Sequence, residues 1–458
     1  MAEAVATHPV SRDCFFYSFI HHFIIKMLEK IFKLKDHGTT PRAELIGGIT
    51  TFMTMAYILI VNPAVLSATG MDRDAVFTAT AISAIIGCLL MGLMANLPVA
   101  LAPGMGLNAF FAYTVVIQMG YSWEMALTAV FIEGIIFILL TLLNIREAIV
   151  RAIPQSLKLS ISAGIGLFIT TIGFVNSGII VQGNALSKLG DLHQPAVYLT
   201  LLAVLITGAL LIKKVKGALL IGMAITTIIG IPLGVVSIPD GFSFLSTPPS
   251  LDPIFGKLDF TRLFSIDMAI VVMTFIFMDL FDTAGTLIAV CTKTNLVDAE
   301  GNIPKSKEAF LADAIATTVG AVVGTSTVTS FIESASGVAE GARTGLSTVV
   351  TACLFFVALF IAPIFAIVPT AATSAALIVV GLFMMNMVTH IDFDDYKNAI
   401  PAFLIIIVTP LSYSIAEGII FGVLAYVGVH ILSGNMRKIS LSMYLLALVF
   451  LAKIIFLG

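Results

Sequence analysis

Charged residues are scarce in this sequence. Asp, Glu, Lys and Arg together make up only 11% of its 458 residues, whereas a soluble domain has about 25%. Hydrophobic residues make up 59%, and the mean hydropathy is +1.06. These values exclude an ordinary soluble globular protein and predict a polytopic membrane protein. The net charge of −3 gives no reason to expect nucleic acid as a partner.

The sequence also lacks the motifs of several catalytic and cofactor sites. Its four cysteines are scattered, and no two have the spacing of a metal or redox pair. The glycines at 104 and 106 are not followed by the GK[ST] of a phosphate-binding loop. The GxGD motif of intramembrane aspartyl proteases is missing. We therefore expect neither a metal ion nor a cofactor, and a transporter rather than an enzyme.

Long apolar stretches, bounded by Pro, Gly and charge clusters, predict fourteen helical spans of about 20 residues. They lie near residues 44–66, 74–95, 98–118, 123–144, 156–178, 195–213, 217–236, 265–290, 308–324, 326–341, 345–366, 368–389, 399–413 and 414–432. A further apolar stretch at 441–457 contains Lys453, and we expect it to lie in the membrane interface.

Loop charge predicts the orientation of these spans. With the N-terminus in the cytoplasm, the inner loops receive eighteen of the 24 Lys and Arg residues, and the outer loops receive four. Positive residues gather in the cytoplasmic loops of membrane proteins. We therefore expect a multi-pass protein of the cell (inner) membrane with both termini in the cytoplasm.

The chain looks doubled. The stretches 97–111 and 326–340 are both interrupted by Pro, Gly or polar residues, and they lie about half the chain apart. A unit of seven spans is odd, so its second copy must run inverted, and paired broken segments point to a transporter site. This pattern predicts a cytoplasmic segment 1–43, a first repeat 44–236, an outer linker 237–264, a second repeat 265–432 and a C-terminal segment 433–458. The character of the sequence changes at Met27, and we expect residues 1–26 to be dispensable.

Three acids stand where a membrane span should be apolar. Asp279 and Asp282 lie inside the eighth span, and Glu333 follows a Thr/Ser-rich break in the tenth. A carboxylate at membrane depth is costly unless it lines a cavity or has a partner, and unwound backbone is tolerated there only where it faces protein or water. The pattern predicts a substrate site near the bilayer midplane, with half-helices that begin at Pro103–Gly104 and Glu333–Ser334.

Four segments carry a family resemblance: HGTTPRAELIGGITTFMTMAYILIVNP (37–63), NLPVALAPGMGLNAFF (96–111), MDLFDTAGTL (278–287) and TSFIESASGVAEGARTG (329–345). They are similar to the AzgA-like purine permeases, a branch of the nucleobase transporter superfamily that also contains the uracil and xanthine permeases. The resemblance covers nearly the whole chain from Met27. It implies two inverted seven-span repeats, with a core domain of spans 1–4 and 8–11 and a gate domain of spans 5–7 and 12–14. It also implies short strands in spans 3 and 10 that meet antiparallel at the site.

In that superfamily, one acid from span 8 and one from span 10 hold the base, and the matching positions here are Asp282 and Glu333. The uracil branch has Glu in span 8, so the shorter Asp282 leaves more room, which suits a bicyclic purine. A carboxylate accepts hydrogen bonds from ring N–H or exocyclic NH₂ groups. A neutral base needs a driving ion, and acids in membrane spans commonly relay protons. We expect both acids to take part in proton coupling, with Glu333 mainly binding the base and Asp282 mainly coupling.

The other predicted site residues surround these two acids. As substrate-binding residues we expect Asp282, Glu333, Phe331, Ser334, Gly104 and Asn108, and as supporting residues Asp279, Asp313, Thr51 and Thr329. Three plainer interpretations remain open. Asp282 could be a structural acid, Glu333 could cap the half-helix that follows it, and Glu340 could form a local ion pair with Arg343.

The predicted function is proton-coupled uptake of purine nucleobases (adenine, hypoxanthine and/or guanine) by an elevator or rocking mechanism of alternating access. The expected partners are the purine, protons and the lipid bilayer, and the sequence leaves open whether the chain works as a monomer or a homodimer. One alternative is a permease of the uracil/xanthine type. Another is an anion transporter of the sulfate/bicarbonate type, which would favour a cation or bare helix N-termini at the site.

Overall fold

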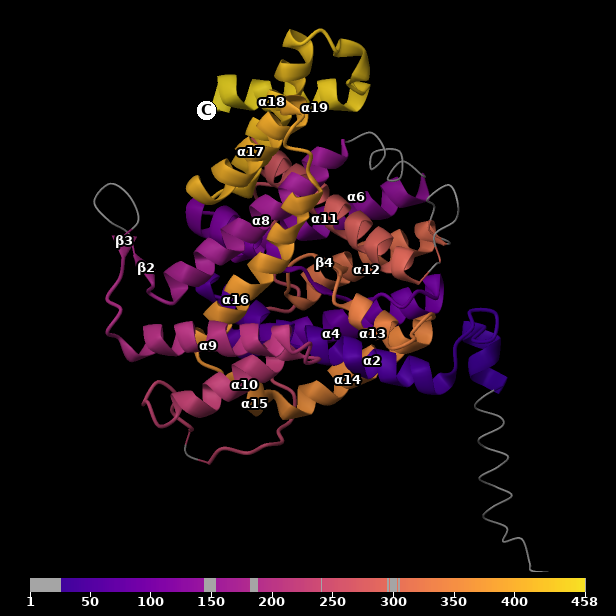
Figure 1. Cartoon of the computed structure of the whole chain (residues 1–458), viewed down its shortest axis with the longest axis vertical. Coiled ribbons are helices and arrows are strands. Elements are labelled where there is room, and N and C mark those ends of the chain that lie inside the picture. The colour runs from indigo at the N-terminus through magenta and orange to yellow at the C-terminus, as the bar shows by residue number, and fades with distance from the viewer. Residues whose placement is uncertain are drawn as a thin grey trace, which may run out of the picture.

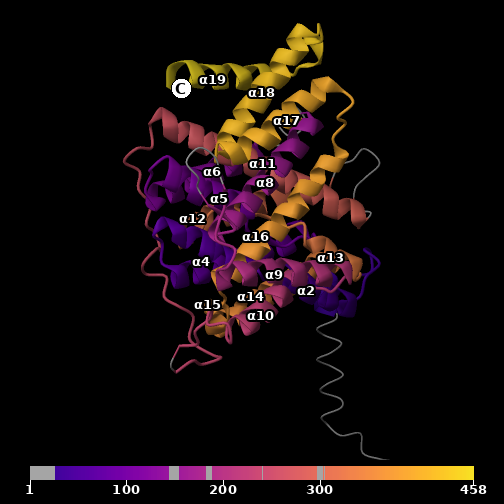
Figure 2. The same cartoon turned by 60° about the vertical axis from the view of Figure 1, so that its left-hand side comes forward.

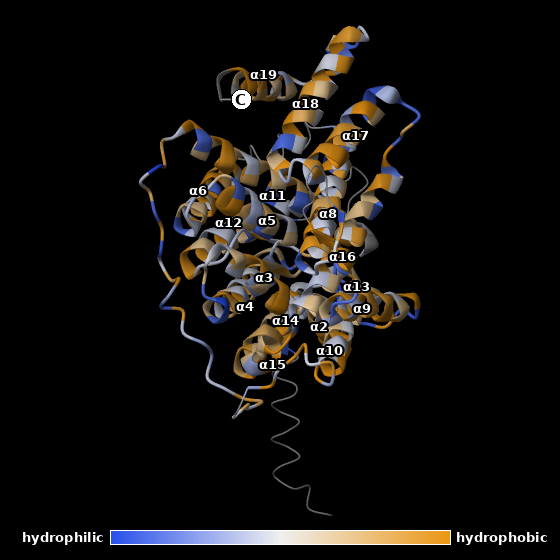
Figure 3. Cartoon of the chain, turned by 90° about the vertical axis from the view of Figure 1, so that its left-hand side faces the viewer, coloured by the Kyte–Doolittle hydropathy of each residue, from blue (hydrophilic) through white to orange (hydrophobic). Residues whose placement is uncertain are grey.

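The computed structural model describes residues 26–143, 154–181, 188–239, 241–294, 296, 303 and 305–457. Within these residues, nine helices are long and apolar enough to cross a membrane, and four shorter apolar helices accompany them. Figure 3 shows hydrophobic residues along most of the helices. The chain is therefore a predominantly helical, polytopic membrane protein, as its composition predicts. Nearly all of the extension 1–26 lies outside the described residues.

The first half of the chain contains one segment for each of its seven predicted spans. After a helix over residues 26–32 come α2 (Pro41–Met55), α3 (Ile58–Leu66), η1 (Ser67–Thr69), α4 (Arg73–Leu90), η2 (Met91–Ala95), β1 (Leu101–Pro103), α5 (Met105–Ala109), η3 (Phe110–Gln118), α6 (Trp123–Leu142), α8 (Gln155–Asn176), β2 (Ile180–Val181), β3 (Lys188–Leu189), α9 (Pro195–Ile212) and α10 (Ala218–Gly230).

The second half of the chain begins at α11. Its elements are α11 (Ile266–Lys293), α12 (Ser306–Val323), β4 (Val328–Ser330), α13 (Ser334–Ala339), α14 (Gly345–Ala358), η4 (Leu359–Ile361), α15 (Ala362–Ala366), α16 (Thr370–Met385), η5 (Asn386–His390), α17 (Tyr396–Leu411), α18 (Ile415–Leu432), η6 (Met436–Lys438) and α19 (Leu441–Leu457). Helix α19 coincides with the last predicted apolar stretch, packs against α18, and lies beside it at the top of Figure 2.

Local sequence explains where the helices begin and end. The side chains of Asp72, Ser122 and Ser265 each accept a hydrogen bond from the backbone N–H three residues later, which satisfies a donor that the first helical turn leaves unpaired. The predicted span 217–236 was too long, because α10 ends at Gly230. Beyond it, Pro232 has no backbone N–H to continue the helix, and Gly234 has φ +70°.

The helices pack as two groups, and each group combines elements from both halves of the chain (Figures 1 and 2). Group 1 contains α2 to α6 with β1, and α11 to α14 with β4. In it, α12 packs on α4 and α6, and α14 packs on α2 and α4. Group 2 contains α8, α9, α10 and α16 to α19. There, α16 packs on α8 and α9, and α17 packs on α8 and α18.

Two short strands lie at the heart of group 1, where Figure 1 shows β4 near the centre of the molecule. Strand β1 pairs antiparallel with β4, with Leu101 opposite Ser330 and Pro103 opposite Val328. Backbone bonds of 3.0 Å extend the pairing at both ends, from Gly104 to the carbonyl of Thr327 and from Phe331 to that of Ala100. The two broken segments of the sequence are therefore joined to each other, and every residue of both strands is buried.

The linker between the halves follows the surface of group 1. Its residues 237–239 and 241–264 contain no helix or strand. The backbone N–H of Ser246 donates to Phe360, and that of Gly256 donates to Val322, at 3.0 and 2.8 Å. The hydroxyl of Thr78 donates to the carbonyl of Pro249 at 3.0 Å. The linker is thus fastened to α4, α12 and η4.

Candidate substrate site

Asp282 contacts strand β4 through the hydroxyl of a threonine. It lies in α11, and its side chain is half-buried. Thr329 of β4 donates its hydroxyl to Oδ2 of Asp282 at 3.3 Å. The structure therefore brings Asp282 against the strand that leads to Glu333, and it places the predicted supporting residue Thr329 between the two segments.

A buried cluster of oxygen atoms lies beside Asp282, around the hydroxyl of Thr283. This hydroxyl is 3.1 Å from Oδ1 of Asp279, 3.0 Å from Oδ1 of Asp313 and 2.8 Å from the hydroxyl of Thr329. All four side chains have no exposed surface. A hydroxyl carries one proton and cannot donate it to all of its neighbours. The hydroxyl of Thr283 therefore joins Asp279 to Asp313, and Thr329 connects this cluster to Asp282.

Glu333 is held from a different side, by the first span. It follows β4 and occupies the N-cap position of α13, but its side chain makes no cap hydrogen bond with this fully described helix. The interpretation of Glu333 as a helix cap is therefore wrong. Instead, the hydroxyl of Tyr57 donates to its Oε1 at 2.7 Å, and the hydroxyl of Thr54 lies 3.4 Å from its backbone carbonyl. The side chain of Glu333 is half-buried.

Three of the other predicted binding residues lie at the joints of the two strands. Phe331 and Ser334 are both buried, and the hydroxyl of Ser334 accepts a hydrogen bond from the backbone N–H of Ala100 at 3.0 Å. A Cβ added at Gly104 would overlap Cγ2 of Thr329. Glycine at 104 therefore allows the close approach of β1 to β4 beside Asp282.

Asn108 and Thr51 pack around this centre. Asn108 is fully buried, and its amide oxygen accepts a hydrogen bond from the hydroxyl of Ser326, just before β4. Thr51 lies against Gly337, which is about one turn along α13 from Glu333. A Cβ added at Gly337 would overlap the hydroxyl of Thr51. Both residues thus link the first half of the chain to the β4–α13 segment.

Sequence reasoning missed two residues that hold the acids in place. Tyr57 contacts Glu333, and Thr283 joins Asp279 to Asp313. A usable signal was present in each case. Tyr57 follows Thr54 by three residues, a spacing that would place both on one face of a continuous helix, and Thr283 directly follows Asp282.

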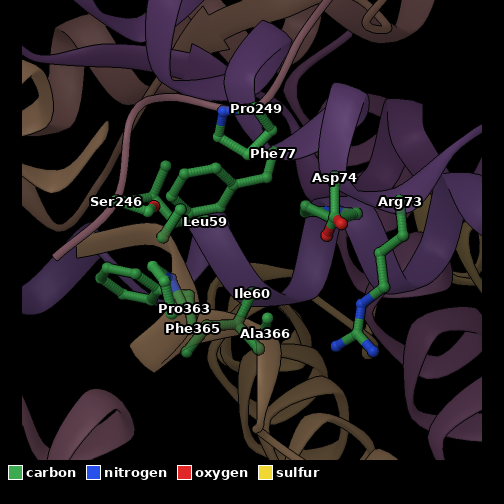
Figure 4. A pocket seen from close by; sticks show the side chains of 12 residues that line it. Leu59, Ile60, Arg73, Asp74, Phe77, Ser246, Pro249, Pro363, Phe365 and Ala366 are labelled. Atoms are coloured by element: carbon green, nitrogen blue, oxygen red, sulfur yellow. The ribbon is translucent and has the colours of Figure 1, made fainter. Parts of the chain in front are cut away.

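Two cavities lie away from these residues. One of about 270 Å³ lies between α3, α4, α15 and the linker, where Figure 4 shows Phe77, Pro249 and Phe365 with Arg73 and Asp74 to one side. A neighbouring cavity of about 290 Å³ shares Pro363 and Ala366 with it and continues towards Val236 and Phe242. In the described part of the chain, no predicted site residue lines either cavity.

One ion pair joins the two groups. Lys216, in the turn between α9 and α10, contacts Glu340 at the end of α13, with 2.5 Å between Nζ and Oε1. Arg343 instead donates to the carbonyls of Val338 and Ala342, at 2.7 and 2.6 Å. The expected local pair of Glu340 with Arg343 is therefore wrong. Both Glu340 and Lys216 remain partly exposed.

Comparison with known proteins gives consistent matches along nearly the whole chain. A family model described as "Permease family" matches residues 42–421. A putative permease of Methanocaldococcus jannaschii is 46% identical over 95% of this chain and 100% of that protein. The guanine/hypoxanthine permease PbuG of Bacillus subtilis is 45% identical over 94% of this chain and 100% of its own length. The adenine permease AdeP of Escherichia coli is 42% identical, covering 94% and 96%.

Solved structures share the fold at much lower identity. The transmembrane domain of a cyanobacterial bicarbonate transporter, BicA, has a TM-score of 0.63 and 19% identity, covering 82% of this chain and 97% of that one. Murine solute carrier 26 family member A9, an anion transporter in an inward-facing state, has a TM-score of 0.61 and 11% identity, covering 94% and 74%. These likenesses concern the fold alone.

Proposed function

This chain belongs to the permease family and, within it, to the AzgA-like purine permeases of the nucleobase transporter family, and from this premise we propose that it takes up adenine, hypoxanthine and/or guanine in symport with protons. Its relatives are named for these bases: two are guanine/hypoxanthine permeases and two are adenine permeases. Uptake across the cell membrane, with both termini in the cytoplasm, is part of the proposal.

One observation carries the choice of substrate class. Asp282 and Glu333 lie beside the paired strands at the centre of group 1, each held by a hydroxyl from another element. Among the described residues, neither forms an ion pair with Lys or Arg. Carboxylates accept hydrogen bonds from the N–H groups of a neutral base, whereas they would repel an anion. This favours a purine over the anion substrates named for transporters with the same fold.

We assign the fold to fourteen spans in two inverted seven-span repeats. The support is that each half supplies one interrupted segment, that these segments pair as β1 and β4, and that both groups draw helices from both halves. In this assignment, group 1 is the core domain that carries the substrate and group 2 is the gate domain. Movement of group 1 against group 2, as an elevator or by rocking, would then alternate access to the site.

The two acids have different proposed roles. Glu333 binds the base, because its carboxylate is oriented by Tyr57 and stays half-buried. Asp282 couples transport to protons, because Thr329 connects it to the buried cluster of Asp279, Thr283 and Asp313. Acids connected in this way are typical of proton relays inside membrane proteins.

Purified protein in proteoliposomes tests the function directly. We expect an inward proton gradient to drive accumulation of radiolabelled adenine, hypoxanthine or guanine, and an uncoupler to abolish it. Xanthine and uracil separate the purine permease from the uracil/xanthine alternative, and bicarbonate and sulfate test the anion alternative. Uptake of an anion without uptake of any base would overturn the proposal.

A further inference from the structure

We propose that Tyr57 is a positioning residue for substrate binding: its phenol fixes Oε1 of Glu333, so that Oε2 faces the base. This rests on the proposed function, because it assigns Glu333 to the substrate. Tyr57 lies between α2 and α3, far from Glu333 in the sequence, and only 1% of its surface is exposed. Its hydroxyl is 2.7 Å from Oε1.

A break in the first span places the phenol. Helix α2 ends at Met55 and α3 begins at Ile58. Between them the backbone tightens, because the N–H groups of Leu59 and Ile60 bond to the carbonyls three residues earlier, at 3.1 and 3.0 Å. This local change of pitch accompanies the turn of Tyr57 towards the β4–α13 joint.

A glycine seam, formed by Gly47 of α2 and Gly337 of α13, brings these two helices close together and so sets the distance between Tyr57 and Glu333. A Cβ added at Gly337 of α13 would overlap the carbonyl oxygen of Gly47 and the hydroxyl of Thr51, both in α2. One added at Gly47 would be 2.9 Å from the carbonyl oxygen of Gly337. The backbones of α2 and α13 are therefore in direct contact. Tyr57 and Glu333 are set by two elements that cannot move apart without opening this seam.

The chemistry of the two groups decides which of them donates. A buried phenol needs a hydrogen-bond partner, since an unpaired hydroxyl in an apolar site is costly. Tyr57 has one proton to donate, and a carboxylate has acceptor sites on both oxygens. Among the described residues, no other side chain donates to the Glu333 carboxylate. Tyr57 thus donates to Oε1, and in this proposal Oε2 accepts from a purine N–H.

The test removes only the hydroxyl. Tyr57→Phe should raise the KM for the purine about tenfold and change the maximal rate by less than twofold, because a hydrogen bond to a charged group has this scale. The control is Tyr444→Phe, which removes a phenol that donates to the carbonyl of Met436 in the C-terminal segment. It should leave KM unchanged. A general structural role would instead lower the maximal rate and the amount of folded protein.

A double-mutant cycle then asks whether Tyr57 acts through Glu333. In a Glu333→Gln background, Tyr57→Phe should change purine binding by less than twofold, and thermal unfolding without substrate should show the same non-additivity. Additive effects in both assays would overturn the proposal. Non-additive unfolding with an unchanged KM would also overturn it, while leaving purine transport intact. If the parent carries no purine, the proposed function fails, and the substrate-free cycle still decides whether the phenol holds this carboxylate.

Discussion

The interiors of the two groups satisfy their polar atoms in different ways. Among the described residues, the fully buried carboxylates Glu44, Glu133, Asp279 and Asp313 all lie in group 1. Glu44 accepts hydrogen bonds from the backbone N–H groups at the start of α14, and Glu133 accepts one from the hydroxyl of Thr327. These bonds join elements that are far apart in the sequence.

Four buried threonines of group 2 make local bonds. The buried hydroxyls of Thr200, Thr226, Thr227 and Thr409 each donate to a carbonyl four residues earlier in the same helix. Such bonds satisfy the hydroxyl without connecting helices. The comparison teaches that the buried carboxylates of group 1 connect distant elements around the paired strands, whereas these threonines of group 2 bond within their own helices.

The largest expected effect comes from preventing the proposed movement of group 1 against group 2. In a variant without native cysteines, Lys216→Cys and Glu340→Cys would place two thiols where the ion pair now joins the groups. A bifunctional thiol reagent should then abolish uptake, and reduction of a cleavable reagent should restore it. Each single-cysteine variant serves as the control. Full transport in the cross-linked protein would contradict relative movement of the two groups.

The next effect concerns the cluster around Thr283. Thr283→Val removes the hydroxyl shared by Asp279 and Asp313, and we expect a loss of about 3 kcal/mol of unfolding free energy, because buried acids would lose their common partner. The matched change in group 2 is Thr226→Val, which removes a hydroxyl bonded within its own helix. It should cost less than about 1 kcal/mol. Thermal unfolding in detergent compares the two, and equal losses would undo the distinction.

A smaller difference in stability is expected between alanine substitutions at two glycines, one in each group. Gly104→Ala introduces a methyl group against Thr329 and should destabilise the protein by about 2 kcal/mol, because the strands must move apart. At Gly208, in α9 of group 2, an added Cβ meets no atom within 4 Å. Gly208→Ala should stabilise by about 0.5 kcal/mol. Unfolding midpoints of both variants give the test, and a tolerated Gly104→Ala would argue against close strand packing at the site.

The sequence predicted the helices well because their signals are local. Apolar length and flanking Pro, Gly and charge located the segments, and the acids at Asp279, Asp282 and Glu333 stood out by being costly in a span. The contacts of these acids were not predictable in the same way. Tyr57 reaches Glu333 through a backbone break and a glycine seam, and Glu340 pairs with Lys216 from the other group. Both depend on how distant segments pack, which periodicity does not report.

The central claim is that the two half-buried acids divide the work of transport. Glu333→Gln turns part of an acceptor into a donor, so purine affinity should fall by about 1.5–3 kcal/mol, the scale of a hydrogen bond to a charged group. Asp282→Asn imitates a permanently protonated acid and should bind purine better than the Glu333 variant. Calorimetry on the purified proteins measures both affinities, and unchanged binding by Glu333→Gln would contradict its assignment.

The most direct measurement is accumulation of radiolabelled purine by Asp282→Asn in proteoliposomes with an imposed pH gradient. The parent should concentrate the base inside the vesicles in response to the gradient. The variant should bind the base and equilibrate it across the membrane, with no response of the final level to pH. If Asp282→Asn still concentrates the purine when the gradient is applied, Asp282 is not the coupling residue.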